Sequence, residues 1–264
     1  MDAERADGEA PASPRGGERH LRRRAFLVGG GLTVLGLGGT ALAVGPDGIR
    51  DAYAHIVCGS VPDPPRARPG RRQQGTLEGR KVIIALPPRT RGAVSVVVMF
   101  PEAPGGARAP FDLYAVDLYL AASQGRFAVA AVDDWPSADI VGTLLPYLKA
   151  SGLDTRRIGL LGWSGGGAEA LRLAAQLGAD RVAAVAASSP AVTAARAPLR
   201  ELIDIPIWLG CGEQDDRAPQ TETMLKGLKA LGATTEGGIS SGCQDTAYRI
   251  RVLPEQLAFF TRHL

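Results

Sequence analysis

The stretch GWSGG at residues 162–166 constrains the fold more than any other part of this sequence. An apolar run, RIGLLGW (157–163), precedes the serine, and a helical pattern follows at 165–177. G-x-S-x-G between a strand and a helix is typical of a sharp turn that presents a serine hydroxyl at the edge of a sheet. The residues two before and two after the serine must be small because the turn is tight. The pattern therefore predicts Ser164 as a nucleophile.

The residue after the serine has a predicted role of its own. The backbone N–H of Gly165 would lie at a helix N-terminus, where it could stabilise an oxyanion. A phosphate-binding loop is a competing interpretation, but the Gly-Lys-Ser/Thr of such loops is absent. An incidental serine in a glycine-rich turn is the other alternative.

The surrounding pattern alternates strands and helices. Because the predicted strands are apolar throughout, we expect an α/β fold with a mainly parallel sheet covered by helices on both faces. A Pro lies inside one predicted helix, at Pro146, and another opens the last helix, at Pro254. The predicted strands are 81–87, 94–100, 127–135, 157–163, 182–190, 206–212 and a weak 234–240; the predicted helices are 111–123, 138–152, 165–177, 223–232 and 254–264.

The acid of a serine nucleophile should follow a later strand, since the chain order in this kind of site is Ser, acid, His. WLGCGEQDD (208–216) offers a strand, a Gly turn and then Asp215 and Asp216. The spacing G-x-x-D favours Asp215 over Asp216 as the acid. The alternative is that both are solvated loop acids.

With these motifs the chain resembles the exported α/β-hydrolase-fold esterases of actinobacteria, a broad group that includes the mycolyltransferase-like enzymes. The resemblance covers roughly 81–264 and rests on LLGWSGGGAEALRLAA (160–175), RVAAVAASSPAV (181–192), CGEQDD (211–216) and SGCQDTAYRIRVLPEQLAFF (241–260). It implies an α/β-hydrolase fold, a small-molecule ester or acyl substrate and no cofactor. Relatives read Gly-[Gly or Cys]-His-Asp in the last segment, so Gln244 occupies the position of the catalytic histidine.

This replacement leaves the predicted nucleophile without its usual base. A glutamine amide cannot accept a proton near neutral pH. Of the three histidines, His20 lies in the N-terminal segment, and His263 lies about 14 Å along the last helix from its expected start, away from Ser164. His55 is the less constrained alternative, because no pattern places its segment.

The loop after the strand at 94–100 departs from the family pattern as well. Relatives begin this loop with His-Gly, which supplies the second oxyanion donor. Here the loop begins with Pro101, which has no N–H to donate. Gly105 or Gly106 could replace that donor.

Two functions of different classes follow. The first is a secreted serine esterase that hydrolyses carboxylic esters through Ser164, with activity weakened by the missing histidine. The second is a catalytically inactive hydrolase homologue that acts as a binding or interaction protein.

The N-terminus resembles a twin-arginine export signal. Arg23 and Arg24 precede Phe-Leu, an uncharged glycine-rich stretch extends from Ala25 to Val44, and ALA at 41–43 fits an A-x-A cleavage site. We expect a signal segment at 1–43, a Pro/Gly/Arg-rich lead-in linker at 44–75 and the α/β-hydrolase domain at 76–264. The protein is expected outside the cytoplasm, with membrane attachment only if this segment stays uncleaved.

The composition argues against several other partners. The net charge of +3 is too small and scattered for nucleic-acid binding. Three cysteines and three histidines are too scattered for a metal site. Cys211 ends one predicted strand and Cys243 follows the next, so we expect them to pair in an oxidising compartment, leaving Cys58 free or paired between molecules. The alternative is that Cys211 and Cys243 are two buried thiols.

Overall fold

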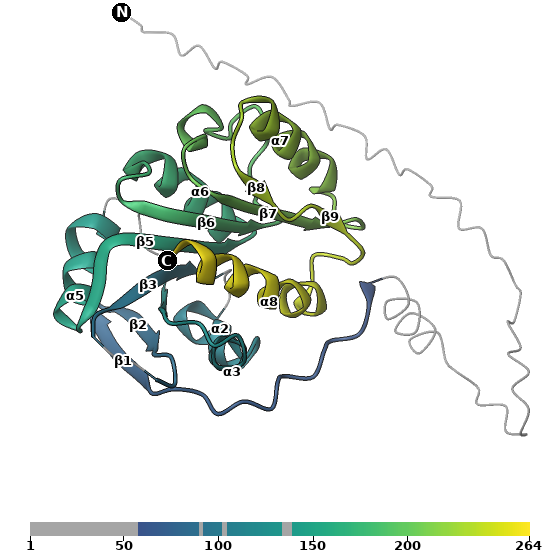
Figure 1. Cartoon of the computed structure of the whole chain (residues 1–264). Helices are drawn as coiled ribbons and strands as arrows, with labels where there is room; N and C mark the ends of the chain where they lie inside the picture. The colour runs from purple at the N-terminus through teal and green to yellow at the C-terminus, as the bar shows by residue number, and fades with distance from the viewer. Residues whose placement is uncertain (1–57, 90–91, 102–104, 134–138) are drawn as a thin grey trace, which may run out of the picture. The chain divides into compact units, whose positions relative to one another are not determined.

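The computed structural model describes residues 58–89, 92–101, 105–133 and 139–264. These residues form a nine-stranded sheet with the order β1-β2-β4-β3-β5-β6-β7-β8, and β9 also pairs with β7 (Figure 1). All neighbouring pairs among β3–β9 are parallel. The β1–β2 and β2–β4 pairs at one edge of the sheet are antiparallel. The predicted α/β class and mainly parallel sheet are therefore confirmed. The strands are β1 (Arg72–Leu77), β2 (Arg80–Ala85), β3 (Val94–Phe100), β4 (Ala128–Val132), β5 (Leu153–Trp163), β6 (Val182–Ser188), β7 (Ile207–Gly212), β8 (Thr235–Glu236) and β9 (Ile239–Ser240).

Helices cover both faces of the sheet. One buried cluster packs the sheet against α5, α6 and α7, and a second packs its other face against α2, α3 and α8. Neighbouring strand residues alternate between the clusters: Ile83 belongs to one and Ile84 to the other. This two-sided burial explains the continuous apolar strands. The helices are η1 (Gly106–Arg108), α2 (Ala109–Asp112), α3 (Val116–Ala122), η2 (Ile140–Leu144, a π-helical turn), α5 (Leu145–Ala150), α6 (Gly165–Leu177), η3 (Arg200–Leu202), α7 (Ala218–Ala230) and α8 (Thr246–His263).

Two local predictions were wrong. The helix expected at 111–123 is broken into α2 and α3, because Ala115 adopts a left-handed conformation with φ 50°. The last helix starts eight residues earlier than Pro254, at Thr246, where the side chain of Asp245 accepts a hydrogen bond from the Tyr248 N–H at 2.8 Å. Pro254 therefore lies inside α8 rather than at its start.

The chain before the sheet was interpreted as linker, yet strand β1 begins at Arg72 within it. The segment ahead of β1 also contacts the domain: the hydroxyl of Tyr119 donates to the Asp63 carbonyl at 3.4 Å. Within the described ranges, no helix combines the length and the hydropathy needed to cross a bilayer. The predicted signal segment 1–43 lies outside the described residues.

Candidate active site

Ser164 lies at the tight connection between β5 and α6. Its backbone has φ 52° and ψ −118°, a conformation that costs a non-glycine residue strain energy. Backbone hydrogen bonds hold it there: the Ser164 N–H donates to the Ser188 carbonyl at 2.9 Å, and the Ser164 carbonyl accepts from the N–H of Ala191 at 2.9 Å. The strand-turn-helix context expected of the motif is thus present.

The glycines on either side of the serine are required by close backbone approach. A Cβ on Gly162 would lie 2.1 Å from the carbonyl oxygen of Gly166. A Cβ on Gly166 would lie 2.2 Å from the carbonyl oxygen of Phe100. By contrast, a Cβ on Gly165 would meet no atom within 4 Å. The two small positions of the motif therefore allow α6 to start directly against β3 and β5.

The turn places Ser164 at the start of a helix. Ser164 is 5% exposed, and Gly165 is the first residue of the 13-residue α6. The backbone N–H groups of a first helical turn lack partners within the helix and carry partial positive charge. Such a turn can stabilise negative charge that develops on an atom bound at Ser164.

Asp215 follows β7, two strands away from β5 on the same edge of the sheet. Its side chain is 7% exposed, and Oδ1 accepts a hydrogen bond from the Arg217 backbone N–H at 2.9 Å. Oδ2 is buried without a hydrogen-bond partner among the described residues. Asp216 is exposed. The buried Asp215, rather than Asp216, therefore has the environment expected of an internal acid.

Gln244 lies in the loop before α8, and this loop packs against the loop that carries Asp215. The Gln214 N–H donates to the Gly242 carbonyl at 3.0 Å. The guanidinium of Arg217 donates through Nη1 to Oε1 of Gln244. The structure thus brings Asp215 and Gln244 together around Arg217. The described hydrogen bonds include none from Gln244 to Ser164 or Asp215, and their direct contact stays a prediction.

The loop after β6 contacts both Ser164 and the strand that precedes Asp215: the Ala191 N–H donates to the Ser164 carbonyl, and the Ser189 N–H donates to the Gly210 carbonyl. This loop carries Ser189, whose hydroxyl lies 3.4 Å from the Cys211 sulfur atom. Burial raises the pKa of the Cys211 thiol, the Ser189 hydrogen bond opposes that rise, and the nearby Asp215 carboxylate adds to it. Cys211 is therefore a protonated thiol packed beneath Asp215 rather than a reactive thiolate.

A buried polar network below the serine was not predicted from the sequence. Gln256 of α8 is 0% exposed, accepts from Nε1 of Trp163 at 3.4 Å and donates through Nε2 to the Ser188 hydroxyl at 2.7 Å. Gln256 thus links Trp163, the residue before Ser164, to Ser188 of β6, whose carbonyl accepts the Ser164 N–H. The hint in the sequence was the polar pair Glu255 and Gln256 within the mostly apolar end of the segment 241–260.

His263 is the single histidine in the described part of the chain, and it lies far from Ser164 along the strands. It lines a cavity of about 260 Å³ together with Ser95 and Asp154, which lie at the amino ends of β3 and β5. Ser164 follows the carboxyl end of β5. Burial lowers the pKa of His263, and its ring contacts Phe259. The expectation that His263 points away from the nucleophile is confirmed. His20 and His55 lie outside the described residues.

The loop after β3 is described only in part. Gly106 adopts φ 53°, and Asp133 fixes the following turn because its Oδ1 accepts from the Ala107 N–H at 2.9 Å. A Cβ on Gly106 would lie 2.3 Å from that oxygen. Residues 102–104, between Pro101 and this turn, lie outside the described residues.

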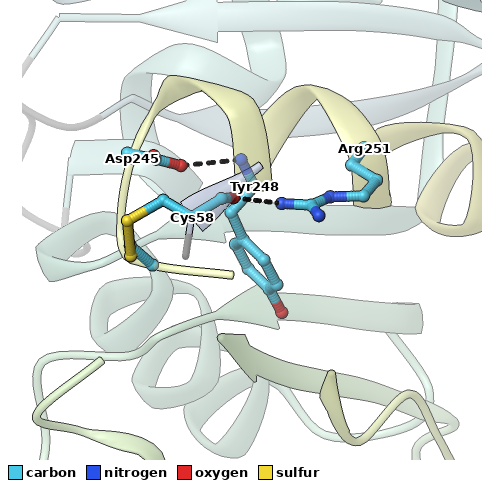
Figure 2. Close-up of a disulfide and its surroundings, with 5 residues drawn as sticks. Cys58, Asp245, Tyr248 and Arg251 are labelled. Carbon is cyan, nitrogen blue, oxygen red and sulfur yellow. Dashed lines mark hydrogen bonds between the residues drawn. A yellow bond between two sulfur atoms is a disulfide. The ribbon is translucent and has the colours of Figure 1, made fainter. Parts of the chain in front are cut away.

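The cysteine pairing differs from the prediction. Cys243 is bonded to Cys58, with 4.9 Å between their Cα atoms, and Cys211 is a free buried thiol. Figure 2 shows the disulfide beside the start of α8, and Arg251 of the next helical turn donates to the Cys58 carbonyl at 3.0 Å. The prediction was wrong because no periodic pattern indicates where the segment around Cys58 lies. The disulfide fixes that segment to the loop that carries Gln244.

The described residues contain no group of three or more His, Cys, Asp or Glu side chains arranged to bind a metal ion.

No model of a protein family matches the sequence, and no curated protein matches it. Solved structures do match the fold. An S-formylglutathione hydrolase from Staphylococcus aureus is 12% identical with a TM-score of 0.63, covering 72% of this chain and 98% of that chain. The substrate-bound fluorophosphonate-binding serine hydrolase F of the same species is 14% identical with a TM-score of 0.63, covering 74% and 99%. A ferulic acid esterase is 15% identical with a TM-score of 0.64, covering 74% and 98%. The chain has the α/β-hydrolase fold.

Proposed function

We propose that this protein is an exported serine hydrolase of esterase type that acts on carboxylic esters through Ser164. The strained backbone of Ser164 between β5 and α6 is the observation that carries the proposal. Backbone strain of this kind persists only where the surrounding structure enforces it, and it concentrates at functional sites. The fold shared with an S-formylglutathione hydrolase and a ferulic acid esterase supports the same class.

In this proposal Ser164 attacks the ester carbonyl, the Gly165 N–H stabilises the oxyanion, and Asp215 is the acid of the site. The weak step is proton transfer. A serine hydroxyl needs a neighbour that takes its proton and later returns it to the leaving group. Gln244 can only hold a hydrogen bond, and its amide oxygen already accepts one from Arg217. We therefore expect slow turnover.

The alternative is a catalytically inactive homologue that binds a ligand or a partner. The Gln244–Arg217 hydrogen bond and the proline at position 101 favour it, because both occupy places where a hydrolase needs a base and an N–H donor. The two functions differ in whether the Ser164 hydroxyl can be activated.

A fluorophosphonate probe separates the two functions, because it reacts with activated serines. We expect slow labelling at Ser164, identified by peptide mass spectrometry, and none in Ser164→Ala. A neighbour of the same fold is itself described as fluorophosphonate-binding. Absence of labelling in the natural protein would favour the binding protein over the esterase.

The proposed location outside the cytoplasm has support from the disulfide Cys58–Cys243. Disulfides persist in oxidising compartments and are rare in the cytosol. The sequence of the N-terminal segment supplies the route, with Arg23 and Arg24 ahead of the uncharged stretch.

Replacing Arg23 and Arg24 with lysine should block export by a twin-arginine route and leave the protein in the cytoplasm. Cell fractionation followed by immunoblotting measures this, with the natural protein as reference and N-terminal sequencing to test cleavage near Ala43. Equal amounts of the variant and the natural protein outside the cytoplasm would contradict the proposed route.

A further inference from the structure

Arg217 contacts two of the three predicted site residues, Asp215 and Gln244. Its backbone N–H donates to Oδ1 of Asp215 at 2.9 Å, and its guanidinium donates to Oε1 of Gln244. One residue thus contacts both the predicted acid and the residue in the histidine position. The side chain is half-buried, at the start of α7.

This cation has a neutral partner instead of an anionic one. Among the described residues, the Arg217 guanidinium forms no salt bridge, and its one side-chain hydrogen bond is to the amide oxygen of Gln244. The acids of these loops do not pair with the guanidinium: Oδ1 of Asp215 accepts the Arg217 backbone N–H, while its Oδ2 is buried without a partner among the described residues. Oδ1 of Asp245 accepts from Tyr248 at 2.8 Å. Asp216 is exposed.

The unused donors of Arg217 are suited to a carboxylate. A guanidinium has five N–H donors in a planar fork, and a carboxylate can accept two of them in parallel. A half-buried cation also gains more from an anion than an exposed one does, because water screens the pair less. A ligand with a carboxylate would therefore find a preformed partner between the loops that carry Asp215 and Gln244.

We propose that Arg217 is a specificity residue that binds a carboxylate of the ligand at the Ser164 site, so that this site takes anionic esters such as half-esters of dicarboxylic acids. The inference rests on the proposed function, because it names the substrate class of the same site. A purely structural Arg217, which only holds Gln244 in place, would give no such preference.

A matched pair of esters tests this inference. Monomethyl succinate is an anion at neutral pH, and dimethyl succinate is its neutral counterpart of nearly the same size. Dissociation constants from isothermal titration calorimetry should show the anion bound about tenfold more tightly, the effect of one charge-assisted hydrogen-bonded contact. Arg217→Gln should bring the two constants together, and Arg217→Lys should keep part of the preference because it retains the charge but not the fork.

The matched control is Arg181→Gln. Arg181 is exposed and precedes β6 at the amino end of the strands, so its loss removes one positive charge away from Ser164. This variant should keep the tenfold preference. Equal binding of the two esters by the natural protein, no binding of either, or an unchanged preference in Arg217→Gln would overturn the inference.

Fluorophosphonate labelling of the same samples distinguishes this failure from failure of the proposed function. Labelling of Ser164 without any preference for the anion would overturn the role of Arg217 and leave the esterase standing. A preference for the anion that depends on Arg217, without labelling, would support the role of Arg217 and overturn the esterase.

Discussion

Gln244→His should raise kcat/KM for a small activated ester by about 10²- to 10⁴-fold, the range that a positioned general acid–base contributes. Histidine at this position would face the loop of Asp215, whose buried Oδ2 has no partner within the described residues and can accept an imidazole N–H. The same substitution removes the amide that Arg217 contacts. The measurement is the initial rate of 4-nitrophenyl acetate hydrolysis.

Two further variants make this comparison decisive. Ser164→Ala in the Gln244→His background is the blank, and Gln244→Asn controls for loss of the glutamine without gain of a base. Fast hydrolysis by the natural protein that depends on Ser164 would contradict the missing base and direct attention to His55. No gain in Gln244→His would indicate that the oxyanion donors after Pro101 are absent as well.

Removing the Cys58–Cys243 disulfide should lower the stability of the protein substantially. Replacing Cys58 and Cys243 with serine opens a covalent loop that spans 185 residues of sequence. Because long loops restrict the unfolded chain most, we expect the free energy of unfolding to fall by about 3–5 kcal/mol. Urea unfolding followed by circular dichroism measures the change.

The free thiol provides the control. A reductant should destabilise the natural protein and Cys211→Ala, because both contain the Cys58–Cys243 bond, but it should not affect the double serine variant. If Cys211→Ala instead abolished the effect of the reductant, Cys211 would be part of the disulfide and the observed pairing would be contradicted.

Strand and helix order could be predicted well because local pattern determines it. The expected strand at 94–100 coincides with β3, and the helix at 165–177 coincides with α6. Prediction failed where the conformation or the side chain of a single residue sets a helix boundary. Ala115 adopts φ 50° and splits a helix that the apolar spacing predicted as continuous, while Asp245 caps α8 ahead of the proline that was expected to mark its start.

The site could be predicted only as far as the sheet organises it. Parallel strands bring their carboxyl ends to one edge, and this rule places the residues after β5 and β7 correctly from sequence. The contacts of Arg217 with Gln244 and of Gln256 with Ser188 depend instead on how loops and a distant helix pack. Such contacts join residues 27 and 68 positions apart, and no periodicity encodes them.

The Gln256 network makes the position of the predicted nucleophile dependent on α8. Gln256 joins Trp163, 93 positions earlier, to Ser188, and α8 covers one face of the sheet (Figure 1). During synthesis the G-x-S-x-G segment emerges before α8, so the strained turn lacks these supports until α8 has been made and has docked. A chain truncated ahead of α8 would retain every letter of the G-x-S-x-G motif and still lack the packing that holds its serine in place. Synthesis and docking of α8 are therefore the steps that complete the support of this turn.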